Sequence, residues 1–335
     1  MPYNKPFREP AELIEELRGL GMGVPDEEVA LQFLRRVGYY RSGGYRYVFR
    51  EKLPAAERDA RTRTFRKPTY VVGSSLTDVE RIERFDAKLR EVCQAGLADF
   101  ELRARAAIAH ALARHDVFGH TNTNHLDLDE ARKTTGRDSK TKFEVWEETY
   151  LEAIRASSSE DFVAHLLVKY GHPLPIWATV DVLSFGSLPY LYDLMRRDDR
   201  LEVSRSFGVA QDNKFGAWLR SMVDFRNYCA HGARLFNRHF KRDVRVVSGA
   251  IDTALLGHVT NREFSVSDTP SSRTYVNAAL LAYMLRKHSS GSSWHLTFKT
   301  QMRKFPEIEV GDRRLISPES DMGFPDDWER LGLWN

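Results

Sequence analysis

Cysteine is scarce in this sequence, and no long apolar run is present. Cys93 and Cys229 are the two cysteines among the 335 residues, and they lie far apart in apolar stretches with helical character. Such residues are typical of buried free thiols in a reducing compartment, and they indicate neither a disulfide framework nor a zinc site. The best candidate for a membrane span, VNAALLAYML, has half of the roughly 20 residues that a spanning helix needs.

A strong excess of one charge is also missing. The net charge is +3, with 29% charged and 42% hydrophobic residues, which are the proportions of a soluble globular protein. Because the total charge is small, a nucleic-acid partner has to be inferred from local clusters of basic residues. The segment MPYNKPFREP is polar and has no apolar signal core, so we expect a cytoplasmic protein.

Helical periodicity recurs along most of the chain. Thr77 and Glu80 fit a capping box at the start of the longest helical segment, which continues to about Arg114 as one helix or two in tandem. Thr141 and Glu144 fit a second capping box. Nearer the N-terminus, Asp26 can cap a short helix that Gly38 can end. Strand signals are few, and RDVRVVSG is the best of them. The sequence therefore predicts an all-α fold.

The stretch VDFRNYCAHGARLFNR combines a predicted helix end with several basic residues. Gly232 is typical of the position just past a helix, which places His231 in the last turn of a helix from about Phe215. Residues four apart share a helix face, so Asn227 aligns with His231. The long side chain of Arg226 can swing towards the imidazole at an exposed end. The helix dipole favours a charged His231, and neighbouring arginines oppose it.

This combination suits RNA cleavage without a metal. Histidine can act as acid or base near pH 7, arginine can hold the phosphate with paired donors, and Asn227 can add a neutral hydrogen bond. One pair of Arg226 and His231 is too little for both proton transfers, so a second copy from a dimer partner would complete the site. The same spacing recurs at Arg105 and His110, so spacing alone leaves open that His231 only caps its helix.

Six ordered blocks resemble the AbiF/AbiD-like family of bacterial abortive-infection proteins, which belongs to the HEPN superfamily. The blocks are VALQFLRRVGYYRSGGYRYVFR, FDAKLREV, FELRARAAIAHAL, PIWATVDVLSFGSLPYLY, WLRSMVDFRNYCAHGARLFNR and MGFPDDWERLGLW. The HEPN signature of an arginine, a polar residue and a following histidine falls on Arg226, Asn227 and His231. The family's glutamate and arginine one turn apart in the long helix match Glu101 and Arg105.

Two positions depart from the family pattern. Gly232 stands where a histidine or bulky residue usually follows the signature histidine, and Asp181 stands where the family usually has a glutamate. Neither change removes the signature. The resemblance implies a HEPN-type helical core at 75–245, an N-terminal helical and basic extension at 1–74, and a C-terminal helical extension at 246–335 that packs on the core.

The resemblance also implies a function and its partners. We expect an anti-phage effector that cleaves RNA as a metal-independent endoribonuclease without a cofactor, with a homodimer formed through the HEPN core. Proteins of this family are associated with a small structured non-coding RNA, so a cognate RNA is an expected second partner. Whether that RNA inhibits or guides the protein stays open.

Several basic and aromatic residues are candidates for RNA contact. They are Arg234, Arg238, His239, Lys241 and Arg242 after the motif, Tyr45 and Arg46 near the N-terminus, and Arg63, Arg66 and Lys67 in the following basic segment. The alternatives are that the aromatic residues pack the N-terminal helices onto the core and that the basic runs are solvated surface. Glu101 and Arg105 could likewise be a simple ion pair within one helix.

Three rival functions remain open at this stage. One is a non-catalytic RNA-binding protein of a phage-defence or toxin–antitoxin-like complex, in which the same residues only hold RNA. Another is an antitoxin-like interaction module. The third is a metal-dependent phosphoesterase, because GHTNTNHLDLDE contains side chains that can bind a metal, although their spacing matches no ligand motif. The stretch holds His120, His125, Asp127, Asp129 and Glu130.

Overall fold

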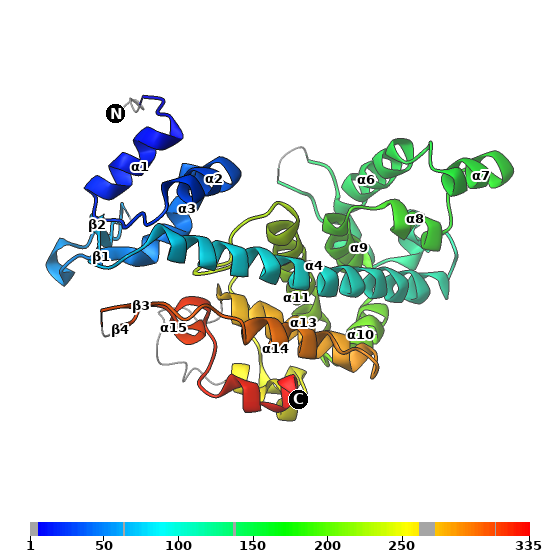
Figure 1. Cartoon of the computed structure of the whole chain (residues 1–335). Coiled ribbons are helices and arrows are strands. Elements are labelled where there is room, and N and C mark those ends of the chain that lie inside the picture. The colour runs from blue at the N-terminus through cyan, green and yellow to red at the C-terminus, as the bar shows by residue number, and fades with distance from the viewer. Residues whose placement is uncertain (1–5, 63, 137–138, 261–271, 312) are drawn as a thin grey trace.

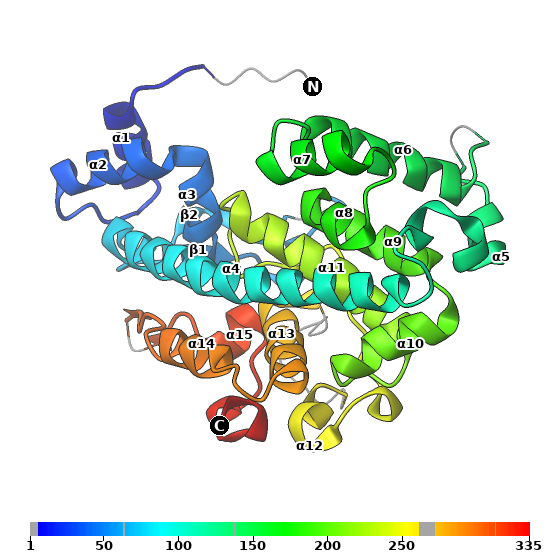
Figure 2. The same ribbon diagram turned by 90° about the vertical axis from the view of Figure 1, so that its right-hand side faces the viewer.

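The structure is a computed structural model that describes residues 6–62, 64–136, 139–260, 272–311 and 313–335. In these ranges it contains fifteen α-helices and two small antiparallel sheets of two strands each, so the predicted all-α class is confirmed. The helices are arranged around one long helix, α4 (Leu76–Ala113), which crosses the molecule (Figures 1 and 2). Among the described residues, no helix is both long enough and apolar enough to cross a membrane.

Helix α4 is a single unbroken helix of 38 residues. At about 1.5 Å per residue it is long enough to span a whole domain. Buried side chains occur along its full length, and α3, α8, α10, α11, α13 and α14 all pack on it. Its cap is Ser75, whose hydroxyl accepts a hydrogen bond from the N–H of Thr77. The predicted capping box of Thr77 and Glu80 is therefore wrong, because the helix begins before Thr77 and Glu80 pairs with arginines instead.

The N-terminal region has three helices and a hairpin near one end of α4, where α2 and α3 contact α4 and α1 packs on α2 (Figure 1). The elements are α1 (Pro10–Gly19), α2 (Glu27–Val37), α3 (Tyr39–Arg46), β1 (Arg50–Lys52) and β2 (Arg66–Tyr70). As a local reading of the sequence predicts, Asp26 caps α2 by accepting from the N–H of Val29, and Gly38 ends it at a φ of +84°. The β1–β2 hairpin was not predicted from the sequence.

Seven helices form the middle of the chain. They are α5 (Leu128–Arg132), α6 (Lys142–Ala156), α7 (Asp161–Tyr170), α8 (Ile176–Val182), α9 (Leu188–Leu194), α10 (Arg197–Ser206) and α11 (Asp212–Ala230). The predicted capping box of Thr141 and Glu144 is confirmed at the start of α6. Helix α10 gave no clear signal in the sequence, because RDDRLEVSRS is almost entirely polar and Val203 is its only buried apolar residue.

The C-terminal region packs on the other side of α4 from α6 and α8 (Figure 2). Its elements are α12 (Thr253–Leu256), α13 (Thr274–His288), α14 (Trp294–Met302), β3 (Glu309–Val310), β4 (Arg313–Arg314) and α15 (Pro318–Met322). Helix α13 is buried on every side from Thr274 to Leu285. The strand predicted at RDVRVVSG is wrong: Val244 is buried, but the described chain offers no neighbouring strand with which this segment could pair.

The two cysteines are free and buried, as the sequence predicts. Burial raises the pKa of Cys93 on α4 well above its usual value, and the thiol of Cys229 on α11 acts in the same direction. The same two helices carry Glu101 and Arg226 of the candidate site.

Candidate functional site

The candidate site begins where α11 crosses α4. Glu101 of α4 lies between two arginines: its Oε2 is 3.4 Å from Nε of Arg226, and its Oε1 pairs with Arg105. Arg105 also donates to the backbone carbonyl of Val180 in α8. Glu101 therefore joins three helices, and its contact with Arg105 is more than an isolated ion pair within α4.

Arg226 is held by two further contacts. Its guanidinium lies 5.4 Å from the centre of the Phe185 ring, at the distance of a cation–π interaction. Its Nη1 donates to Oδ1 of Asn227 over 3.3 Å. About a quarter of the Arg226 side chain (26%) remains exposed, whereas Phe185 is fully buried. The arginine is thus positioned by its neighbours and still reaches solvent.

His231 is the C-terminal cap of α11, one residue beyond the last helical position. Its N–H donates to the carbonyl of Asn227, and Gly232 follows with a φ of +63°, a conformation that favours glycine. The residue is exposed, and its imidazole has no hydrogen bond or ion pair within the described chain. The carbonyl of Gly232 accepts from Arg41, so α3 holds the backbone that follows the histidine.

A buried carboxylate fixes the segment beyond His231. Asp86 of α4 is fully buried and accepts from the N–H groups of Leu235 (3.1 Å) and Phe236 (2.7 Å). It also accepts from the hydroxyl of Tyr45 over 2.6 Å and pairs with Arg90. Burial raises the pKa of Asp86, while Arg90 and these hydrogen bonds favour its charged form. Asp86 was not among the predicted site residues, although a carboxylate on the apolar face of a long helix indicates such a network.

Three of the RNA-contact candidates lie in the packing between α3 and the core. Tyr45 is fully buried, and Arg46 is nearly so, with its guanidinium over the ring of Tyr39 at 4.0 Å. Arg234 donates to the carbonyl of Gly44, and burial lowers its pKa. The burial of Tyr45 and Arg46 fits the packing alternative, whereas Arg234 is half-buried.

The other candidates lie nearer the surface. Arg238 stacks on Tyr228, with its guanidinium 4.5 Å from the ring centre, and Nδ1 of His239 is 3.0 Å from the hydroxyl of Ser272. Lys241 is exposed, as is Arg242, which pairs with Asp224 at 2.7 Å.

The basic segment before α4 is divided. Arg66 lines a pocket remote from His231, and Lys67 is exposed and pairs with Glu51 at 3.1 Å. Arg63 lies outside the described residues.

The residues considered as metal ligands do not converge. His120 is buried and contacts Thr179, His125 lies 3.7 Å from Asp116, and Glu130 pairs with lysines. Within the described ranges, no group of three or more histidine, cysteine, aspartate or glutamate side chains is arranged to hold a metal ion.

Comparison with known proteins places the chain in a family. The model of the Abi-like protein family matches residues 32–237, more than half of the chain, and the match contains Glu101, Arg226 and His231. No curated protein and no solved structure gives a significant match. The chain therefore belongs to the Abi-like protein family.

Proposed function

We propose that this protein is an abortive-infection effector of the HEPN superfamily that cleaves RNA without a metal, using Arg226 and His231. The observation that carries the proposal is the exposed imidazole of His231, which has no partner among the described residues. It lies at the end of α11, the helix whose Arg226 is held by Glu101 and Phe185. His231 caps α11 through its backbone N–H, so its ring is free to contact a substrate.

The chemistry follows from these side chains. The 2′-hydroxyl of a ribose loses a proton, attacks the adjacent phosphorus and displaces the 5′-oxygen, which gains a proton. The products carry a 2′,3′-cyclic phosphate and a 5′-hydroxyl. His231 is suited to move one of the two protons, and Arg226 is suited to neutralise the phosphorane with donors that Glu101 and Asn227 leave unused. Asn227 supplies a neutral hydrogen bond.

A dimer would complete the site. Each copy has one His231, and two proton transfers are needed, so a second copy facing the first supplies the second histidine. Arg238, His239, Lys241 and Arg242 follow the motif in the sequence and would contact phosphates that flank the cleaved bond. A cognate structured RNA, as the AbiF/AbiD-like resemblance implies, would use the same basic surface.

The test compares wild-type protein with the His231→Ala and Arg226→Ala variants. Each is incubated in excess EDTA with total cellular RNA and with short labelled RNAs, and the product ends are analysed for cyclic phosphate. We expect cleavage by the wild type alone, with RNA affinity largely kept in His231→Ala. His165→Ala, which removes an exposed histidine on α7, is the matched control and should cleave normally.

Two results would contradict the proposal. Cleavage that persists in His231→Ala would move the active site elsewhere. Wild-type protein that binds RNA but cuts none, even with extract from phage-infected cells, would identify a non-catalytic RNA-binding protein.

A further inference from the structure

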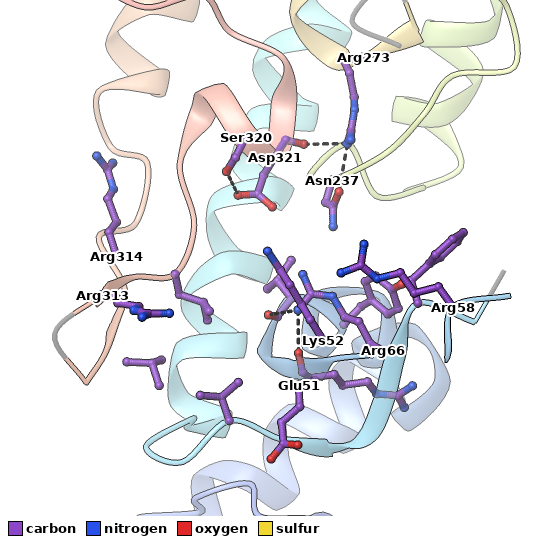
Figure 3. A pocket seen from close by; sticks show the side chains of 17 residues that line it. Glu51, Lys52, Arg58, Arg66, Asn237, Arg273, Arg313, Arg314, Ser320 and Asp321 are labelled. Carbon is purple, nitrogen blue, oxygen red and sulfur yellow. Dashed lines mark hydrogen bonds between the residues drawn. The ribbon is translucent and has the colours of Figure 1, made fainter. Parts of the chain in front are cut away.

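A second site lies away from His231, between the β1–β2 hairpin and the C-terminal segment that contains β3, β4 and α15 (Figure 3). It is a pocket of about 820 Å³, and neither Glu101, Arg226 nor His231 lines it. Pockets that hold small molecules have volumes of about 300–1,000 Å³, so this one is large enough for a nucleotide. Its walls come from the two ends of the described chain, with Asn237 between them.

The lining is strongly cationic. Among the described residues that line the pocket, seven side chains are positive: Arg50, Lys52, Arg58, Arg66, Arg273, Arg313 and Arg314. Two are acidic, Glu51 and Asp321, and the charge of Asp321 offsets part of the charge of Arg66 and Arg273. Glu51 pairs with Lys67 at 3.1 Å, and the buried Asp321 accepts from the N–H of Ser317 and the hydroxyl of Ser320 (Figure 3). The pocket therefore carries a large excess of positive charge.

Three of the arginines are positioned by neutral groups. Arg66 donates to the carbonyls of Val48 (3.0 Å) and Arg50 (2.7 Å). Arg58 donates to the carbonyl of Leu53, and Arg314 to that of Ile316. A carbonyl fixes a guanidinium without neutralising its charge. Burial lowers the pKa of Arg66, because removal from water disfavours the charged form of the guanidinium.

Two cationic side chains have no partner among the described residues. The side chains of Lys52 and Arg313 are exposed, lie on opposite walls of the pocket, and form no hydrogen bond or ion pair with the described chain. In addition, Nε of Arg50 is buried without a hydrogen-bond partner. Like charges gathered in a concave site repel one another, and a ligand with several negative charges would relieve both this repulsion and the unpaired donors.

We propose that this pocket binds a nucleotide through its 5′-polyphosphate, either as a free nucleotide or as the 5′ end of an RNA. The phosphates would lie among the arginines, whose paired donors match phosphate oxygens. Tyr47 and Phe65 also line the pocket, and Phe65 is 41% exposed, so an aromatic face is available for the base. The proposal goes beyond RNA cleavage and does not depend on it.

The experiment measures dissociation constants of the full-length protein at physiological salt, where non-specific phosphate binding is weak. The probes are ATP, GTP, inorganic triphosphate, adenosine, and one short RNA with either a 5′-triphosphate or a 5′-hydroxyl. The test variant is Lys52→Ala/Arg313→Ala, which removes two exposed side chains that form no hydrogen bond or ion pair with the described residues. The control is Arg132→Ala/Arg155→Ala, which removes two exposed, unpaired cations on α5 and α6.

We expect triphosphate-bearing probes to bind, adenosine not to bind, and the test variant to bind at least about tenfold more weakly, a loss of about 1.4 kcal/mol. The control variant should match the wild type. Tight binding of the 5′-triphosphate RNA alone would identify the RNA end as the source, and binding of ATP or GTP alone would identify the free nucleotide. His231→Ala should bind equally well, so a failure of the cleavage proposal leaves this result unaffected.

Three outcomes would overturn the proposal. No triphosphate-bearing probe binds, or binding is the same in the Lys52→Ala/Arg313→Ala variant. The third is that the 5′-triphosphate RNA and the 5′-hydroxyl RNA bind equally well while ATP and GTP do not bind. This result would mean that the pocket binds an RNA backbone.

Discussion

Nε of Arg226 lies 3.4 Å from Oε2 of Glu101, and this contact ties the helix that ends in His231 to the longest helix of the protein. Both side chains are mostly shielded from solvent, at 26% and 17% exposure, so the ion pair is less screened than one on the surface. Because Glu101 also pairs with Arg105, its carboxylate is fixed from both sides. Glu101 is therefore a positioning residue for Arg226.

Glu101→Gln should lower RNA cleavage more than RNA binding. The amide keeps the shape of the side chain but loses the charge that holds Arg226, and a misplacement of about 1 Å can cost about 100-fold in rate. We expect a 10- to 100-fold lower single-turnover cleavage rate and a dissociation constant for RNA within about threefold of the wild type. Glu202→Gln, which breaks an exposed pair with Arg114, is the control. An unchanged rate in Glu101→Gln would remove Glu101 from the site.

Helix ends were predicted well where the signal is local. Asp26, Gly38, Thr141 and Glu144 each act within one turn of their own position, so the sequence alone determines their role. The sequence signal for an N-cap at Thr77 was equally strong, but Ser75, two residues earlier, is the N-cap of α4. Where two residues that can cap a helix lie close together, the path of the preceding chain decides which of them is the N-cap.

Contacts between distant segments could not be predicted from periodicity. The motif at Arg226 and His231 is visible because one helix carries it. In contrast, Asp86 reaches the backbone of Leu235 across 149 positions, and the cationic pocket is built from two hairpins near opposite ends of the described chain. Such contacts depend on how the helices pack on one another, and the periodicity of a single helix contains no information about that packing.

Asp86→Asn should destabilise the fold strongly. The substitution removes the closer of the two carboxylates that pair with Arg90, leaving Glu83 at 3.9 Å, and it weakens the acceptor for Leu235 and Phe236. Breaking a buried ion pair by removing one partner costs about 3–5 kcal/mol. Urea denaturation should show this loss, whereas Glu91→Gln, which affects an exposed pair with Lys88, should change the free energy of unfolding by less than about 1 kcal/mol. A loss in Asp86→Asn as small as in the control would mean that the network contributes little.

Gly96→Ala should also destabilise the protein, through a steric clash. A Cβ at Gly96 would lie 2.5 Å from Cε2 of Trp294, closer than real side chains approach. The ring cannot retreat easily, because its Nε1 donates to the carbonyl of Val92 over 2.8 Å. We expect a loss of about 1–3 kcal/mol by urea denaturation. The same change at Gly19 meets nothing within 4 Å and should stabilise α1 by about 0.4–1 kcal/mol. Equal effects at the two glycines would contradict the packing of α14 on α4.

Acidification should destabilise the fold through His120. Burial lowers the pKa of His120 from 6.5 to about 4, so the folded protein keeps the ring neutral where the unfolded chain protonates it. The resulting stability is complete above pH 6.5, is lost as the pH falls towards 4, and is gone below that value. One proton corresponds to about 1.4 kcal/mol per pH unit, so the total loss is about 3 kcal/mol. Burial also lowers the pKa of His258 to about 4, which adds a loss in the same direction.

The variant His120→Phe separates this effect from the titration of carboxylates. Phenylalanine fills the space beside Tyr150, whose ring centre is 5.2 Å from that of the histidine, but it cannot take up a proton. The free energy of unfolding, measured by urea denaturation at intervals between pH 4 and 7, should fall less steeply with decreasing pH in the variant. The difference in slope should be about 1.4 kcal/mol per pH unit, the contribution of one proton. His165→Gln, at an exposed position on α7, should keep the wild-type slope. If His120→Phe keeps it as well, the ring of His120 is protonated as readily in the folded protein as in the unfolded chain.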